Sequence, residues 1–287
     1  MFTHLSLFSG IGGLDLAAEW AGFKTAGQCE RADYPTRVLE KHWPDVPRWR
    51  DIKTLTKEDF YERTGCRTVD VISGGFPCQP FSVAGKQKGK GDDRYLWPEM
   101  RRVISVLAPS FVVCENVPGI LRIAASDVVS DLENIGYHVV VFDFEAAAVG
   151  AWHRRERIAF VGNREENVAH SEGERQQGNG TGGKQVAATR YEKEKSKGCN
   201  ICDTAEQIQR EWGHRELSTQ PGLGGVADGL PGWVDGYWQI EPDGVPRITN
   251  RRTHRSDRLK TLGNAVVPQQ FYPIFKAIAE VLNDNGN

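Results

Sequence analysis

The sequence lacks any apolar run long enough to span a membrane, and its first residues do not form an apolar leader. Met1 to His4 lead directly into a strand-like run. We therefore expect neither a signal peptide nor a transmembrane helix, and we expect a cytoplasmic protein.

Cysteines are few and scattered. The 287-residue chain has six, without the regular spacing of a disulfide framework: Cys29, Cys66, Cys78, Cys114, Cys199 and Cys202. In a protein without an export signal, reduced thiols are expected. Cys199 and Cys202 have the spacing of half a zinc site, but no second pair accompanies them, and His170 and His214 are unconvincing partners. We predict no metal, with a structural zinc as the minority alternative.

A large excess of one charge is absent too. Lysine and arginine number 36 and acidic residues 38, which gives a net charge of −2. Bulk charge therefore neither requires nor excludes a nucleic-acid partner. An internal repeat is also missing, which excludes solenoid and propeller architectures.

Strand-like and helix-like patterns alternate over residues 1–163. Apolar runs predict strands at 4–8, 25–30, 48–52, 69–73, 111–114, 139–144 and 157–161. Helical spacing occurs at 13–20, 34–42, 96–106, 126–135 and 272–282. This rhythm predicts an α/β fold with a mainly parallel, helix-covered sheet. Right-handed crossovers then place the strand-end loops along one edge.

The composition changes after residue 163. Residues 164–254 are rich in Gly, Gln, Asn and charge, which is typical of loops, although three tryptophans (Trp212, Trp233 and Trp238) indicate a small irregular core. We therefore divide the chain into a catalytic and cofactor-binding domain at 1–163, a region of target recognition at 164–254, and a segment at 255–287 that returns to the catalytic domain.

Cys78 lies in the segment Gly74-Gly75-Phe76-Pro77-Cys78-Gln79-Pro80-Phe81-Ser82, directly after the predicted strand at 69–73. In open α/β sheets, chemistry gathers beyond the carboxyl ends of the strands. A buried structural cysteine is the usual alternative. The flanking glycines, prolines and polar residues favour a nucleophile.

A glycine turn, Phe8-Ser9-Gly10-Ile11-Gly12-Gly13, follows the first predicted strand. Its spacing does not match the G-x-G-x-x-G fingerprint of nicotinamide dinucleotides, because Asp15 stands three positions after Gly12. Glu30 and Asp51 follow the second and third strands, where they could bind ribose hydroxyls and an adenine amino group. A tight turn with two solvated acids is the alternative. Together the three signals favour an adenosyl ligand.

Two further polar groups are predicted at the same edge. Glu115 ends the strand at 111–114 and could act as a proton donor or hydrogen-bond clamp. Strand alternation places Arg155 and Arg157 on one face, so both could point at one ligand. A surface acid and a charged strand edge are the alternatives.

The ordered motifs resemble those of DNA (cytosine-5-)-methyltransferases. They are Phe8–Gly13, Gly75–Ser82, Glu115-Asn116-Val117, Arg155-Glu156-Arg157 and Gly263-Asn264-Ala265-Val266. The resemblance covers residues 1–163 and 255–283. It implies a Rossmann-like S-adenosylmethionine-dependent methyltransferase sheet with a small irregular target-recognition domain.

The resemblance also implies a mechanism. The thiolate of Cys78 attacks carbon 6 of a flipped-out cytosine, and Glu115 binds the ring nitrogen and exocyclic amine. Arg157 holds the ring carbonyl oxygen, and Arg155 supports the site. S-adenosyl-L-methionine supplies the methyl group to carbon 5.

Further residues are carried over from the resemblance or predicted from local charge. The cofactor-binding residues are Phe8, Gly10, Gly12, Glu30, Asp51, Ile52, Pro77, Asn264 and Val266. The DNA-binding residues are Gln79, Ser82, Lys86, Lys88, Arg251, Arg252 and Arg255, where phosphate contacts are expected. The predicted partner is double-stranded DNA and the protein is expected to act as a monomer.

Two departures from the family pattern concern target recognition. The segment before Gly263 is compressed, with residues 227–231 as the candidate recognition motif, and His153 stands where glutamine is common. The same reaction on structured RNA and an inactive DNA-binding homologue remain as alternatives. The target sequence cannot be read from the chain.

Overall fold

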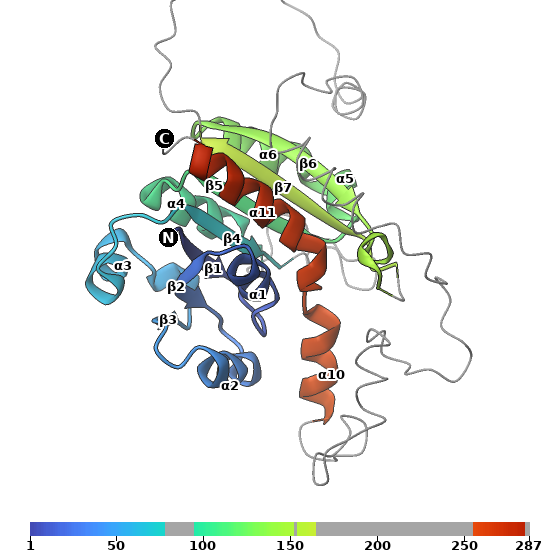
Figure 1. Ribbon diagram of the computed structural model, residues 1–287, viewed down its shortest axis with the longest axis horizontal. Helices are drawn as coiled ribbons and strands as arrows, with labels where there is room; N and C mark the ends of the chain where they lie inside the picture. Colours follow the sequence, from blue (N-terminus) through green and yellow to red (C-terminus); the bar gives the residue numbers. More distant parts are fainter. Residues whose placement is uncertain (78–94, 152–153, 165–254, 285–287) are drawn as a thin grey trace, which may run out of the picture.

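The computed structural model describes residues 1–77, 95–151, 154–164 and 255–284. They form a seven-stranded sheet with helices on both faces (Figure 1). Its strands are β1 (Thr3–Leu7), β2 (Lys24–Cys29), β3 (Arg48–Trp49), β4 (Val71–Gly75), β5 (Phe111–Asn116), β6 (Tyr137–Phe144) and β7 (Arg157–Arg164).

The strand order is β3-β2-β1-β4-β5-β7-β6. Strands β3, β2, β1, β4 and β5 pair in parallel, whereas β7 runs antiparallel to both β5 and β6. The α/β fold with a mainly parallel sheet is thus confirmed. Because β7 is reversed, its first residues lie at the edge where the parallel strands end. Arg157 therefore reaches the same edge as Glu115.

Helices cover the two faces of the sheet. They are α1 (Gly13–Trp20), α2 (Asp33–His42), α3 (Lys57–Thr64), α4 (Trp97–Leu107), α5 (Ile120–Ile123), α6 (Ala125–Glu133), α10 (Arg255–Asn264) and α11 (Pro268–Asp284), with short 3₁₀ turns η1 (Ile52–Thr54) and η4 (Ala146–Val149). None of the helices in these described ranges is both long and apolar enough to cross a bilayer.

Each face has its own apolar core. Side chains of α3, α4 and α6 pack with Leu5, Ile72 and Val112 on one side of the sheet. On the other side, α1 and α11 enclose Val71, Phe111 and neighbouring strand residues. Figure 1 shows α11, in red, lying across the sheet on the side opposite α4 and α6. Strand alternation explains this division, because successive residues of β4 and β5 face opposite cores.

The final helix contributes a large share of the second core. Its buried side chains include Phe271, Ile274, Phe275 and Ile278, all at most 3% exposed. The ring of Phe275 packs edge-on against Phe23 and His4. A segment separated from β7 by about a hundred residues is thus an integral part of the sheet's cover.

Candidate active site

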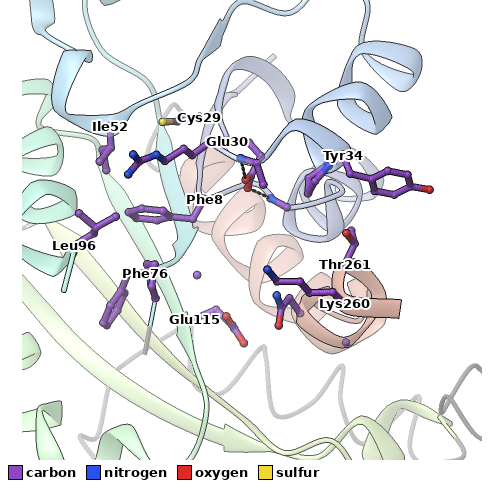
Figure 2. A pocket seen from close by; sticks show the side chains of 18 of the residues that line it. Phe8, Cys29, Glu30, Tyr34, Ile52, Phe76, Leu96, Glu115, Lys260 and Thr261 are labelled. Atoms are coloured by element: carbon purple, nitrogen blue, oxygen red, sulfur yellow. Dashed lines mark hydrogen bonds between the residues drawn. The ribbon is translucent and has the colours of Figure 1, made fainter. Parts of the chain in front are cut away.

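A single continuous cleft of about 1180 Å³ opens at the edge where β1, β2, β4 and β5 end. Predicted site residues from seven separate parts of the chain line it: Phe8, Gly10, Glu30, Asp51, Ile52, Pro77, Glu115, Arg157 and Asn264. Figure 2 shows Phe8 near its centre, with Glu115 and Phe76 on one side and Lys260 and Thr261 of α10 on another. The structure therefore brings Glu115 and Arg157, predicted to be catalytic, to the same cleft as most of the residues predicted to bind the cofactor.

The turn after β1 fixes the carboxylate of Glu30. The backbone N–H of Gly10 donates to Glu30 Oε2 at 2.8 Å, and that of Ala32 donates to Oε1 at 2.7 Å (Figure 2, dashed lines). Phe8 and Gly10 have φ values of +54° and +56°, so the chain turns sharply here. Each carboxylate oxygen keeps a second lone pair, which is available to a hydroxyl donor in the cleft.

Gly12 and Val266 do not line the cleft, but they take part in the packing that shapes the turn. A Cβ on Gly12 would lie 2.4 Å from the ring of Trp43, and its φ is +88°. A Cβ on Gly13 would lie 2.5 Å from the carbonyl oxygen of Val266. The glycines thus allow α2 and the residues before α11 to approach the turn closely. A direct contact of Gly12 or Val266 with a cofactor stays a prediction.

Asp51 and Ile52 lie at the end of β3, where η1 begins. Asp51 Oδ1 accepts a hydrogen bond from the backbone N–H of Lys53 at 3.0 Å, which caps the turn. Arg102 of α4 donates to the carbonyl oxygens of Ile52 and Leu55 at 2.8 and 3.0 Å. Arg102 was not predicted, because its position in an amphipathic helix carries no sign of this contact.

Glu115 and Arg157 form a buried ion pair. Arg157 Nε lies 2.7 Å from Glu115 Oε1, and both side chains are 12% exposed. Gly75 makes room for the carboxylate, since a Cβ there would lie 2.5 Å from Glu115 Oε2. Burial raises the pKa of Glu115, and the positive charges of Arg157 and Arg155 oppose that rise. A carboxyl with a raised pKa keeps its proton to a higher pH than an exposed one, so it can serve as a proton donor.

The prediction that strand alternation places Arg155 and Arg157 on one face is wrong. β7 begins at Arg157, and Arg155 lies outside it with a φ of +34°. Its guanidinium donates to the carbonyl oxygens of Gly263 and Ala265, so the charge still lies near the site but the side chain holds the chain between α10 and α11. The cause is the left-handed backbone at Arg155, which strand periodicity does not describe.

Asn116 connects the two central strand ends. Its Nδ2 donates to the carbonyl oxygen of Phe76 at 3.2 Å, and its Oδ1 accepts from the backbone N–H of Val117 at 2.9 Å. Asn116 is 2% exposed. Its amide therefore fixes the chain just before Pro77. Asn116 lies in one of the motifs, but no role was predicted for it. A polar residue at the end of an apolar strand was the feature that could have indicated one.

A family model described as C-5 cytosine-specific DNA methylase matches residues 2–220. The chain belongs to the C-5 cytosine-specific DNA methylase family. Members of this family use S-adenosyl-L-methionine as the methyl donor. The motif resemblance and the Rossmann-like methyltransferase fold are thereby confirmed.

The chain is similar to curated type II methyltransferases from bacteria. It is 35% identical over 165 residues to the type II methyltransferase M.NgoFVII of Neisseria gonorrhoeae, covering 56% of this chain and 43% of that protein. It is 33% identical to the type II methyltransferase M.AquIA of Picosynechococcus, covering 56% of this chain and 71% of that protein. The matched part of the chain spans less than half the length of the first of these relatives.

Solved structures share the fold of this chain at low identity. The crystal structure of the S. pombe Dnmt2 methyltransferase has a TM-score of 0.58 at 16% identity, covering 99% of this chain and 100% of that one. The Entamoeba histolytica methyltransferase EhMeth has a TM-score of 0.58 at 14% identity, covering 98% and 99%. These likenesses concern the fold alone.

The residues of the cleft fit the family's methyl donor. Glu30 is anchored where ribose hydroxyls can donate to it, and the apolar side chains of Phe8, Ile52 and Leu96 line the wall beside it. Phe76 and Leu96 were not predicted as lining residues. Phe76 lies within the motif Gly75–Ser82, whereas Leu96 carries no signal besides its place at the start of the predicted helix at 96–106.

Some predicted residues lie outside the described part of the chain. They are Cys78, Gln79, Ser82, Lys86, Lys88, Arg251 and Arg252, together with residues 164–254 beyond Arg164, and His153. Arg255 begins α10, but its side chain is not described. Pro77, which directly precedes Cys78, lines the cleft.

Proposed function

We propose that this chain transfers a methyl group from S-adenosyl-L-methionine to carbon 5 of cytosine in duplex DNA. The observation that carries the proposal is the buried Glu115–Arg157 pair, which lines the same cleft as Glu30 and Asp51. An adenosyl-binding end and an end suited to a polar base edge therefore lie in one continuous space. Family membership supports this assignment.

The residues have distinct roles in the proposed reaction. The thiolate of Cys78 adds to carbon 6 of the ring, and the ring's electrons move toward carbon 5 and the ring nitrogen. Glu115 donates a proton or hydrogen bond to that nitrogen and accepts one from the exocyclic amine. Arg157 holds the carboxylate of Glu115 and the ring carbonyl oxygen. The cofactor supplies the methyl group, and loss of the carbon-5 proton then expels Cys78.

The pKa of Glu115 suits this role. Burial among apolar strand residues raises it, which favours the protonated carboxyl and hence proton donation when negative charge develops on the ring nitrogen. Arg157 opposes full neutralisation at rest and keeps the carboxylate in place at 2.7 Å. The base must leave the duplex stack to reach this cleft, because carbons 5 and 6 are otherwise covered by neighbouring bases.

We further propose that the protein acts as a monomer in the cytoplasm and modifies cytosine within a short specific sequence. The similarity to bacterial proteins named type II methyltransferases supports modification linked to restriction. Gln79, Ser82, Lys86, Lys88, Arg251, Arg252 and Arg255 are proposed to contact the DNA. Monomeric behaviour is checked by light scattering of the full chain.

The test uses the full chain, cofactor with a labelled methyl group, duplex DNA of mixed sequence, and structured RNA. We expect label in DNA, on carbon 5 of cytosine. Label in RNA alone would establish the alternative substrate, and cofactor and DNA binding without label would establish an inactive homologue.

Cys78→Ser tests the covalent step. We expect loss of turnover by about a thousandfold or more, with cofactor binding retained. DNA carrying 5-fluorocytosine should form a denaturant-stable adduct with the wild-type chain, because fluorine cannot leave as a proton does. Cys66→Ser is the matched control, since Cys66 is a half-buried thiol that donates to the carbonyl oxygen of Thr64 and does not line the cleft. Turnover by Cys78→Ser would contradict the mechanism.

A further inference from the structure

Arg155 holds the chain between α10 and α11 at two points. Its Nη2 donates to the carbonyl oxygen of Gly263 at 2.7 Å and also to that of Ala265. These carbonyls lie on either side of Asn264, and both Gly263 and Asn264 line the cleft. One guanidinium therefore fixes the backbone that presents Asn264 to the cofactor end of the cleft.

Gln270, near the start of α11, binds the backbone of Arg155 in turn. Gln270 Nε2 donates to the carbonyl oxygen of Arg155 at 3.0 Å and to that of Phe144 at 3.3 Å. Gln270 is only 2% exposed, and its Oε1 has no hydrogen-bond partner among the described residues. Burying an amide with an unsatisfied acceptor is costly, so its two donated bonds must account for its place here.

The backbone at Arg155 is held in a conformation that arginine rarely adopts. Its φ is +34°, which lies in the left-handed region. Such conformations persist where surrounding contacts determine them, and they gather at functional sites. Here the carbonyl bond from Gln270 and the guanidinium bonds to Gly263 and Ala265 fix Arg155 from both ends.

Arg155 lies two residues before Arg157, the partner of Glu115. We propose that Arg155 and Gln270 are positioning residues that couple the cofactor-side chain at 263–266 to the Glu115–Arg157 pair. Gln270 fixes the backbone from which β7 starts, and Arg155 fixes the backbone around Asn264. The cofactor end and the base end of the cleft are thus held by one set of bonds. This inference rests on the proposed function.

The geometry needs an arginine at this position. Both bonds come from Nη2, which the planar guanidinium holds in a fixed orientation, whereas the ammonium of lysine lies on a flexible stem and is not oriented in this way. Arg155→Lys therefore keeps the positive charge near Glu115 but loses the two-point hold. Gln270→Met keeps the length of the side chain and removes both donated bonds. Arg154→Lys is the matched control, because Arg154 is the exposed neighbouring arginine.

The experiment measures binding of S-adenosylhomocysteine to the full chain by calorimetry without nucleic acid, followed by steady-state kinetics. We expect Arg155→Lys and Gln270→Met each to weaken binding about tenfold, and the double variant to be little worse than either single one. Arg154→Lys should bind like the wild type. In turnover, KM for the methyl donor should rise in both variants while KM for DNA stays unchanged.

The outcomes distinguish a failure of the proposed coupling from a failure of the proposed function. If Arg155→Lys binds the cofactor as tightly as the wild type but loses kcat, Arg155 acts on the base directly and the coupling is refuted. Effects that add fully in the double variant would also refute it. A wild-type chain that binds no S-adenosylhomocysteine would refute the proposed function itself, and this inference with it.

Discussion

At the residue scale, Gly75 leaves the space that the carboxylate of Glu115 occupies. A Cβ there would lie 2.5 Å from Glu115 Oε2 and would push the carboxylate off the end of β4. A displacement of about 1 Å at a reacting group can lower a rate about a hundredfold. The glycine is therefore part of the geometry of the proposed catalytic site, although it carries no chemistry.

Gly75→Ala tests this placement. We expect kcat to fall about a hundredfold, with cofactor affinity close to that of the wild type. Gly119→Ala is the matched control, since Gly119 also lines the cleft, has an ordinary φ of −55°, and has no atom within 4 Å of its added Cβ. Near wild-type turnover by Gly75→Ala would show that Glu115 can move without loss.

At the element scale, Arg102 connects α4 to the turn η1. It donates to the carbonyl oxygens of Ile52 and Leu55 and pairs with Glu99 at 2.8 Å. The turn carries Asp51 and Ile52 into the cleft. The position of one helix therefore sets part of the wall of the proposed cofactor site.

Arg102→Ala should weaken binding of S-adenosylhomocysteine about five- to tenfold, because two backbone carbonyls of the turn lose their donors. Calorimetric titration of the full chain measures this. Arg101→Ala is the control: Arg101 pairs with Asp131 at 3.2 Å, is 43% exposed, and should leave cofactor affinity unchanged. Equal affinity in both variants would mean that η1 keeps its shape without Arg102.

The sequence predicted the elements that carry a strong pattern. The helix at 13–20 has the bounds of α1, and the other predicted strands and helices agree within a few residues. Helix α3 was missed because only Phe60 among its residues is fully buried, so it has no apolar stripe. The reversed direction of β7 and the left-handed Arg155 were also missed, since both depend on tertiary contacts that periodicity does not encode.

The site was predictable to the extent that its residues lie in short motifs at strand ends. Glu30, Asp51 and Glu115 are examples, because the parallel sheet brings such positions to one edge. Arg102, Gln270 and Asn116 act through backbone carbonyls of distant segments. No local pattern shows which carbonyl groups these side chains reach, so only the folded chain reveals the contacts.

At the scale of the whole molecule, a buried acid links stability to pH. Asp15 in α1 accepts hydrogen bonds from Ser6 Oγ and Gln28 Nε2, both at 2.8 Å. Burial raises its pKa to about 6, against 3.8 ordinarily, and the nearby charge of Glu19 adds to the rise. The folded chain therefore binds more protons than the unfolded chain between these values. Its free energy of unfolding falls as pH rises through this range.

Asp15→Asn removes this titration with little change of shape. We expect the difference in unfolding free energy, variant minus wild type, to rise by about 2 kcal/mol between pH 4 and pH 7. His4, whose pKa burial lowers to about 3, titrates in both proteins and cancels in the difference. Urea denaturation at a series of pH values measures the effect, and a difference independent of pH would contradict it.

The packing of α11 has a consequence for the newly made chain. Ribosomes add about 5–20 residues per second, so the roughly one hundred residues between β7 and α11 take about 5–20 s to synthesise. During that interval the α1 side of the sheet lacks Phe271, Ile274 and Phe275, which later bury it. The growing polypeptide therefore exposes apolar surface on this side of the sheet for seconds, which is long enough for chaperones to bind before the last helix is synthesised.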